Sequence, residues 1–88
     1  MANAKRYPFN MNKHQHDIFF RYNRCKNELD DKLADREYHI TDAEIDRYEA
    51  LIDALGHILD YGIGIVWLTG KEYGLAHETV LWAGSMRG

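Results

Sequence analysis

The sequence predicts an all-α fold, in which an antiparallel helical hairpin carries a shorter C-terminal helix. Three observations favour this fold class. Apolar residues recur every three or four positions through two long stretches, as they do on one face of a helix. Two Thr-x-x-Glu patterns, which begin at Thr41 and Thr69, are typical of helix N-termini. No glycine or proline interrupts residues 11–37, so the first stretch can form one long helix.

The first ten residues are expected to form an extended N-terminal arm, because Pro8 disfavours the helical conformation in the residue before it. Asn10 or Asn12 can then cap a helix that runs from about residue 11 to about residue 37. The apolar positions that predict this first helix are Met11, Ile18, Tyr22, Cys25, Leu29 and Leu33.

The second helix is predicted to begin at Thr41, whose hydroxyl accepts a hydrogen bond from the backbone amide of Glu44. The Glu44 carboxylate in turn reaches back to the Thr41 amide, and Ile40 and Ile45 occupy the hydrophobic-staple positions. Gly62 is the expected stop. Because only three or four residues link the two helices, they should run antiparallel. The apolar stripe of this helix contains Ile45, Tyr48, Ile52, Leu55 and Leu59, widened by Leu51 and Ile58.

Residues 63–84 fit two descriptions. The runs I-V-W-L-T-G and T-V-L-W-A-G are rich in strand formers, which favours an alternative α+β fold with a C-terminal β-hairpin beside the helical hairpin. However, Thr69 and Glu72 repeat the capping pattern, and β-propensity depends heavily on context. We therefore expect a third helix over about 70–83, with residues 62–68 as a bent connection.

Length and cysteine content bound the class of protein. The 88 residues make a single small helical domain. Cys25 is the only cysteine, so no intrachain disulfide forms, which favours a reducing compartment. The N-terminus has early positive charge but no apolar run behind it, so no secretory signal is expected. The strongest apolar run, Ile63–Leu68, is too short to span a bilayer. We expect a soluble, cytoplasmic protein with no membrane partner.

The net charge of −3 hides a segregation along the chain. Residues 1–27 contain six lysines and arginines against one acid, whereas residues 28–60 contain eleven acids against three bases. The remaining residues are neutral in sum. A function that depends on charge is therefore expected to use either the basic residues 1–27 or the acidic residues 28–60.

Catalytic and metal-binding patterns are weak. The chain has no glycine-rich phosphate loop, no nucleophile elbow and no Ser-His-Asp order. The pairs Asp35/His39 and Asp53/His57 have the four-residue spacing that allows chelation on one helix face, but neither has a third ligand in view. We predict a protein that is not an enzyme and that has no metal site and no cofactor.

A row of carboxylates is the main functional signal. Side chains three or four positions apart on a helix lie about 5–6 Å from one another, so such a row repels itself unless something offsets it. A solvated helix face is the plain alternative. We predict a protein-binding module that presents this row to a basic partner, as a small inhibitor or adaptor that blocks a nucleic-acid-binding site. The predicted partner-binding residues are Asp42, Asp46, Glu49, Asp53 and Asp60 on the second helix and Glu28, Asp31 and Asp35 on the first.

A competing hypothesis uses the basic N-terminal segment, in which lysines and arginines alternate with aromatic residues. Cations that bind phosphates and rings that stack on bases are the ingredients of single-strand or RNA binding. The nucleic-acid-binding residues on this alternative are Lys5, Arg6, Lys13, Arg21 and Arg24.

Aromatic content also predicts self-association. A thin hairpin cannot easily cover all of its large rings, and uncovered rings favour an interface. We therefore expect a homo-oligomer. The rings in question are Phe19, Phe20, Trp67 and Trp82.

Overall fold

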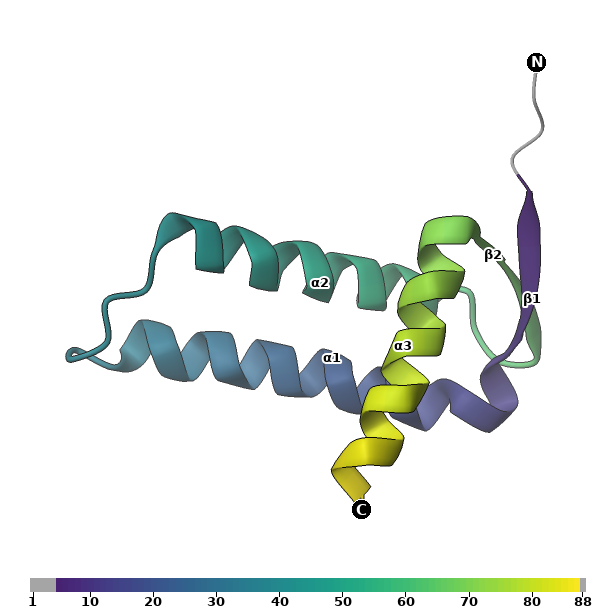
Figure 1. The fold of residues 1–88 in the computed structure, drawn as a ribbon, viewed down its shortest axis with the longest axis horizontal. Coiled ribbons are helices and arrows are strands. Elements are labelled where there is room, and N and C mark those ends of the chain that lie inside the picture. Colours follow the sequence, from purple (N-terminus) through teal and green to yellow (C-terminus); the bar gives the residue numbers. More distant parts are fainter. Residues whose placement is uncertain (1–4, 88) are drawn as a thin grey trace.

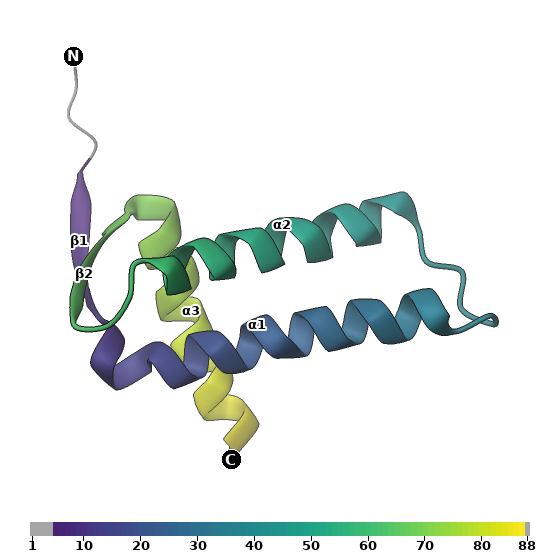
Figure 2. The same ribbon diagram turned by 180° about the vertical axis from the view of Figure 1, so that it is seen from behind.

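Three helices and one two-stranded antiparallel sheet make up the computed structural model, which describes residues 5–87. The two longer helices lie antiparallel as a hairpin, and the third crosses one end of it, next to the sheet (Figure 1; Figure 2). The hairpin and the C-terminal helix are thus as predicted, and the sheet is an addition to the all-α expectation. The elements in chain order are β1 (Arg6–Asn10), α1 (Met11–Ala34), α2 (Asp42–Asp60), β2 (Ile65–Thr69) and α3 (Gly70–Arg87).

Polar side chains begin all three helices, largely as the sequence indicated. The side chain of Asn10 caps α1 by accepting a hydrogen bond from the backbone amide three residues further on (3.2 Å). The Thr41 hydroxyl does the same for α2 (3.1 Å) and the Thr69 hydroxyl for α3 (3.3 Å). At Thr69 the box is complete, because its own amide donates to the Glu72 carboxylate (2.9 Å).

Two helix ends differ from the prediction. α1 stops at Ala34 rather than near residue 37, and the loop spans 35–41 instead of three or four residues. The Asp35 carboxylate accepts a hydrogen bond from the amide of Glu37 (2.9 Å). The local turn that this bond forms replaces the next hydrogen bonds of the helix. α3 continues past its expected end near Ala83 to Arg87, whose guanidinium binds the Asp17 carboxylate on α1. This long-range ion pair holds the last turn in place.

The prediction of a bent connection over residues 62–68 is wrong, because most of it belongs to strand β2. β2 pairs with β1 from Arg6↔Thr69 to Asn10↔Ile65. The alternative C-terminal β-hairpin is wrong about the partner, since the second run lies within α3. The expected N-terminal arm supplies the real partner strand, and its residues 1–4 lie outside the described residues. A pairing so distant in sequence leaves no local signal.

Glycines and a proline shape this sheet. Gly62 and Gly64 have φ values of +88° and +91°, and they turn the chain from the end of α2 into β2. The Met11 amide donates to the Gly64 carbonyl (2.8 Å), one pair beyond the ladder. Because hydrogen-bonded and non-hydrogen-bonded pairs alternate, Pro8 falls in a non-hydrogen-bonded pair. Its missing N–H therefore lies on the free edge of β1, where no ladder bond is lost.

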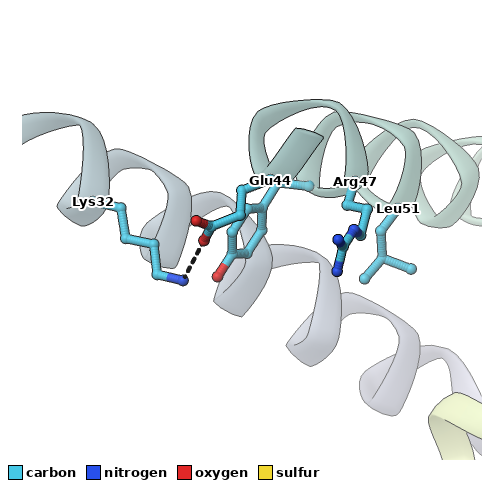
Figure 3. A pocket seen from close by; sticks show the side chains of 5 residues that line it. Lys32, Glu44, Arg47 and Leu51 are labelled. Atoms are coloured by element: carbon cyan, nitrogen blue, oxygen red, sulfur yellow. Dashed lines mark hydrogen bonds and ion pairs between the residues drawn. The ribbon is translucent and has the colours of Figure 1, made fainter. Parts of the chain in front are cut away.

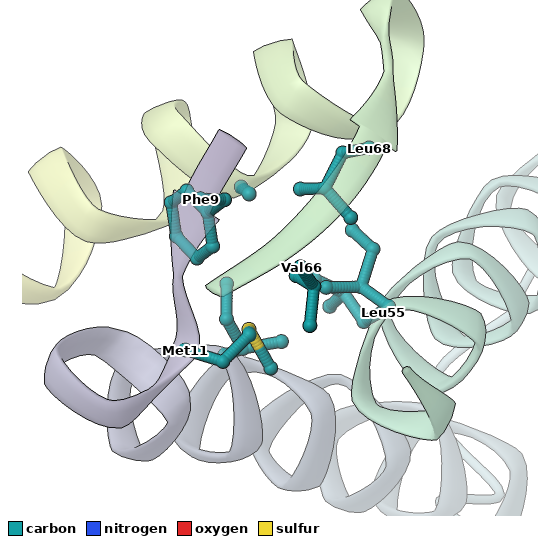
Figure 4. Close-up of a cluster of buried hydrophobic side chains, with 8 residues drawn as sticks. Phe9, Met11, Leu55, Val66 and Leu68 are labelled. Atoms are coloured by element: carbon teal, nitrogen blue, oxygen red, sulfur yellow. The ribbon is translucent and has the colours of Figure 1, made fainter. Parts of the chain in front are cut away.

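The hydrophobic core lies where the sheet and α3 meet the hairpin. Side chains from both strands and from α1 and α2 point toward one another there (Figure 4). The buried members of this cluster are Phe9, Met11, Ile18, Leu55, Ile58, Val66, Leu68 and Ala76.

The rest of the hairpin extends beyond the core. We call residues 26–53, which comprise the outer parts of α1 and α2 and the loop between them, the arm, and the remainder of the described chain the root. No residue of the arm is buried, whereas every buried residue of the described chain lies in the root. The two regions are therefore stabilised in different ways.

Candidate functional site

The five acidic residues predicted on the second helix form one line along α2. They follow one another at steps of four, three, four and seven residues, which confines them to a sector of about 60° on a helix of 3.6 residues per turn. All five are exposed. We call this line, which consists of Asp42, Asp46, Glu49, Asp53 and Asp60, the acidic stripe.

The acidic stripe points away from the core. Helical spacing places it about half a turn from Leu55 and Ile58, the buried residues of α2. One border of the stripe meets the partly buried side chains of Ile52 and Leu59. The stripe therefore adjoins the apolar face of α2 along that border only.

Within residues 5–87, no member of the acidic stripe takes part in an ion pair. The predicted acids of α1 behave differently. Glu28 pairs with Arg24 (3.3 Å) and accepts from the Tyr48 hydroxyl (3.4 Å), so its charge is already offset. Asp31 is exposed but lies about 200° around α1 from Leu29, which faces α2. The Asp35 carboxylate accepts a hydrogen bond from the Glu37 amide in the loop turn. The structure therefore separates the α1 acids from the stripe.

A groove runs along one face of the hairpin beside the acidic stripe. It consists of two adjoining hollows of about 450 Å³ and 210 Å³, which share Ile52 and Asp53. Partly buried apolar side chains from both helices form its floor, among them Leu29 and Leu59. The groove thus combines apolar surface with charge.

Four carboxylates surround this groove, and the sequence reading identified only three of them. Glu49, Asp53 and Asp60 belong to the acidic stripe, and Asp30 reaches the groove from α1. Asp30 was missed because it interrupts the spacing of the other α1 acids. Its spacing of four from Lys26 was the available signal, since such residues share a helix face.

Tyr22 and Gly56 line the larger hollow. A side-chain Cβ at Gly56 would lie 3.2 Å from the Tyr22 ring, so only glycine lets the ring approach α2 this closely without a shift. The ammonium of Lys26 lies 5.2 Å from the centre of the same ring. This arrangement is a cation–π contact, and it shows that the groove accommodates a cation of the chain itself.

Another hollow, of about 270 Å³, lies between α1 and α2 and is filled differently (Figure 3). The Lys32 ammonium is 3.3 Å from the Glu44 carboxylate and lies 5.1 Å and 5.0 Å from the ring centres of Tyr38 and Tyr48. The Tyr38 hydroxyl donates to Glu44 at 2.6 Å. We call these four residues the tyrosine clasp, because they join the two helices and the loop of the arm.

Ionisation in the tyrosine clasp follows these contacts. The pKa of Lys32 is raised, first by its interaction with Tyr48 and then by Glu44. The Tyr38 hydroxyl lowers the pKa of Glu44, and the same hydrogen bond raises the pKa of Tyr38. The shifts of Lys32 and Glu44 favour the charged pair, and the shift of Tyr38 keeps its hydroxyl protonated as a hydrogen-bond donor. Because Lys32 already pairs with Glu44, the carboxylate that lines this hollow, the hollow is not the better docking site.

A polar cluster ties α2 to α3 in the root. The Tyr61 hydroxyl donates to both Glu72 oxygens (3.0 Å), and His57 Nε2 lies 3.3 Å from Glu72. Burial opposes ionisation of Glu72, but the hydrogen bonds from the Thr69 amide and Tyr61 outweigh it and lower its pKa. Every one of these groups has its partner within the chain, which is the arrangement of a structural tie.

The basic residues of the nucleic-acid hypothesis are not gathered as free cations. Arg21 pairs with Glu78 (3.3 Å) and donates to the Thr79 hydroxyl (3.0 Å), and Arg24 pairs with Glu28. The remaining three lie in the root: Arg6 donates to the Trp67 carbonyl (3.1 Å), and Lys5 and Lys13 are exposed.

Other site types find no support in residues 5–87. No group of three or more potential metal ligands gathers there, and no helix there is long and apolar enough to cross a membrane. Cys25 is buried, and this burial raises the pKa of its thiol, which keeps it protonated.

Comparison with known proteins adds nothing to this geometry. No protein-family model matches the chain, and no curated protein and no solved structure is significantly similar to it. A function has to be inferred from the site alone.

Proposed function

We propose that this chain is a non-enzymatic protein-binding module that docks the acidic stripe of α2 on a basic surface of a partner protein. It acts as a small inhibitor or adaptor that covers a surface which would otherwise hold nucleic acid. One observation carries the proposal: five exposed carboxylates form a single line, and none of them has a cationic partner in the described chain.

The energetic reason lies in the repulsion within the stripe. Like charges three or four positions apart destabilise a helix by about 0.2–0.5 kcal/mol per pair. A basic partner removes this repulsion and adds attraction, which also speeds encounter. The stripe from Asp42 to Asp60 is about 27 Å long at 1.5 Å per residue. A row of anions of this length competes with a phosphate backbone for the same lysines and arginines.

The groove beside the stripe supplies the apolar part of the contact. Its floor accepts the aliphatic stem of a lysine or arginine while its carboxylates bind the charged head. The Tyr22 ring offers a further cation–π contact to a partner cation that displaces Lys26, which lies over this ring in the free chain. A cationic side chain of the partner therefore has a defined position, beyond general charge attraction.

The test compares two charge-reversed variants with the same net charge. The stripe variant carries Asp46→Lys and Asp53→Lys. The control carries Asp31→Lys and Glu37→Lys, which are exposed acids outside the stripe and take part in no ion pair within residues 5–87.

Pull-downs from lysate of the source organism, quantified by mass spectrometry, are the measurement. Wild type and control should retain the same basic, nucleic-acid-binding proteins, and the stripe variant should lose them. A retained protein should also lose its nucleic acid when wild-type chain is added. Equal retention by all three proteins, with circular dichroism showing intact helices, would contradict the proposal.

A further inference from the structure

The outer face of the β1–β2 ribbon exposes a row of large apolar side chains. In β2, Val66 and Leu68 point into the core, whereas Ile65 and Trp67 point outward and are 57 % and 55 % exposed. Ile63, just before the strand, is 69 % exposed. Pro8 of β1 lies opposite Trp67 and is also exposed. We call these residues the ribbon row.

The edges of the ribbon do not favour an additional strand. On the β1 edge, Pro8 offers no N–H where a new strand would need one. On the β2 edge, the Trp67 carbonyl already accepts a hydrogen bond from the Arg6 guanidinium (3.1 Å). Strand addition by an extended peptide uses such edge groups. A partner of the ribbon must therefore pack on its face, and the face offers only side chains.

The size of the ribbon row fits a weak interface. At these exposed fractions Ile63, Ile65 and Trp67 present on the order of 350 Å² of apolar surface, comparable to the largest patch on a typical monomer. A stable interface buries about 800 Å² on each partner. The row thus supplies nearly half of the area that such an interface buries, and residues next to the row have to supply the rest.

We propose that the ribbon row is a dimer interface, in which it packs on the same row of a second copy about a two-fold axis near Ile65. In an antiparallel arrangement, Ile63 of each copy packs on the Trp67 ring of the other, and the two-fold axis makes this contact twice. A two-fold interface requires this kind of self-complementary patch. The row needs no other molecule to become covered.

Charge permits this arrangement. Arg6 and Lys5 follow one end of the row, and the Arg6 guanidinium reaches the Trp67 carbonyl (3.1 Å), which lies two residues, or about 7 Å along the strand, from Ile65. In an antiparallel dimer the two guanidinium groups therefore lie on opposite sides of the axis, about 13 Å apart along the strands, which exceeds the screening length of about 8 Å at physiological salt. No residue of the acidic stripe takes part, so the dimer is independent of the proposed function.

Sedimentation velocity from about 1 μM to about 1 mM tests the proposal. Wild type should shift from monomer to dimer across this range. Ile65→Glu places two carboxylates on the axis and should raise the dimer dissociation constant at least about tenfold. Trp67→Ser should act in the same direction. The control is Leu81→Glu, an equally exposed position on α3 (64 %), which should leave the dimer unchanged.

A fluorescence measurement locates the interface. In a Trp82→Phe background, the emission of Trp67 should shift to shorter wavelength as the concentration rises, and Ile65→Glu should abolish the shift. Folding of each variant is checked by circular dichroism. A monomer at every concentration would overturn the proposal. A dimer that survives Ile65→Glu but is lost in Leu81→Glu would overturn it as well, by placing the interface elsewhere.

Discussion

The root and the arm of this molecule use the same two helices but are held together differently. In the root, α1 and α2 pack on β1, β2 and α3, and all buried side chains of the described chain lie there. In the arm, the two helices lie beside each other without a buried side chain, and the tyrosine clasp joins them through a lysine, a glutamate and two rings. Apolar burial dominates the first region and polar contacts the second.

The difference separates stability from recognition. Burial of apolar area gives the root most of the free energy of folding, so the arm is free to carry charge that costs stability. Four of the five members of the acidic stripe lie on the arm. Regions with few buried contacts open at lower free energy than the core. The arm is thus the expected site of local opening and of partner binding.

The largest expected effect on the free energy of unfolding comes from a substitution in the root. Leu55→Ala removes a side chain with no exposure and should lower the free energy of unfolding by about 2–5 kcal/mol. Leu51→Ala, one turn away on the same helix but only partly buried, should cost less than half as much. Urea denaturation measures both. If Leu55→Ala does not fold, Ile58→Val, at about 0.5–1.5 kcal/mol, replaces it. Equal costs at the two leucines would contradict the distinction between root and arm.

An intermediate effect concerns the two capping glutamates. Glu72 in the root and Glu44 in the arm both have lowered pKa values, so each stabilises the fold above an unfolded pKa of 4.5. This contribution is lost as the pH falls through the folded pKa. Below pH 4.5, the stability of Glu72→Gln should therefore decline less steeply than that of wild type. The corresponding change in Glu44→Gln should be smaller, because solvent screens the exposed arm. Thermal unfolding from neutral to acidic pH measures the slopes, and a steeper change for Glu44→Gln would reverse the ranking.

The smallest expected effect on global stability concerns the tyrosine clasp. Lys32→Met keeps the length of the side chain but removes the charge that contacts Glu44 and the two rings. It should change the free energy of unfolding less than either glutamate variant does, because solvent screens an exposed ion pair. Hydrogen exchange should nevertheless speed up in the arm and stay constant in the root. Lys26→Met, which removes a cation that pairs with no carboxylate of the described residues, is the control. Uniform acceleration through both regions would show that the arm does not open separately.

Local chemistry allowed much of the helical structure to be read from the sequence. Thr41 and Thr69 begin their helices as predicted, because a cap depends on residues only three positions apart. The expected ending near Ala83 failed, since the bond between Arg87 and Asp17 extends α3. The strand at β2 was foreseen only by the α+β alternative, and its partner was missed for the same reason, because β1 lies near the other end of the chain.

The candidate site likewise has one feature that the sequence predicted and others that only the structure revealed. The alignment of the stripe acids followed from their spacing, but the pairing of Glu28 with Arg24 and Tyr48 needed the packing of two helices. Likewise, Asp30 joined the groove only when α1 was set beside α2.

The sequence by itself determined where the helices begin, which faces of them are apolar, and that the carboxylates of α2 form one row. These properties arise from contacts within a turn or two of the chain, where residue type and spacing suffice. The tertiary structure alone decided that β1 pairs with β2, that α3 covers one end of the hairpin, and which charges remain unpaired. Such contacts join residues distant in sequence, and their geometry exists only once the chain has closed on its core.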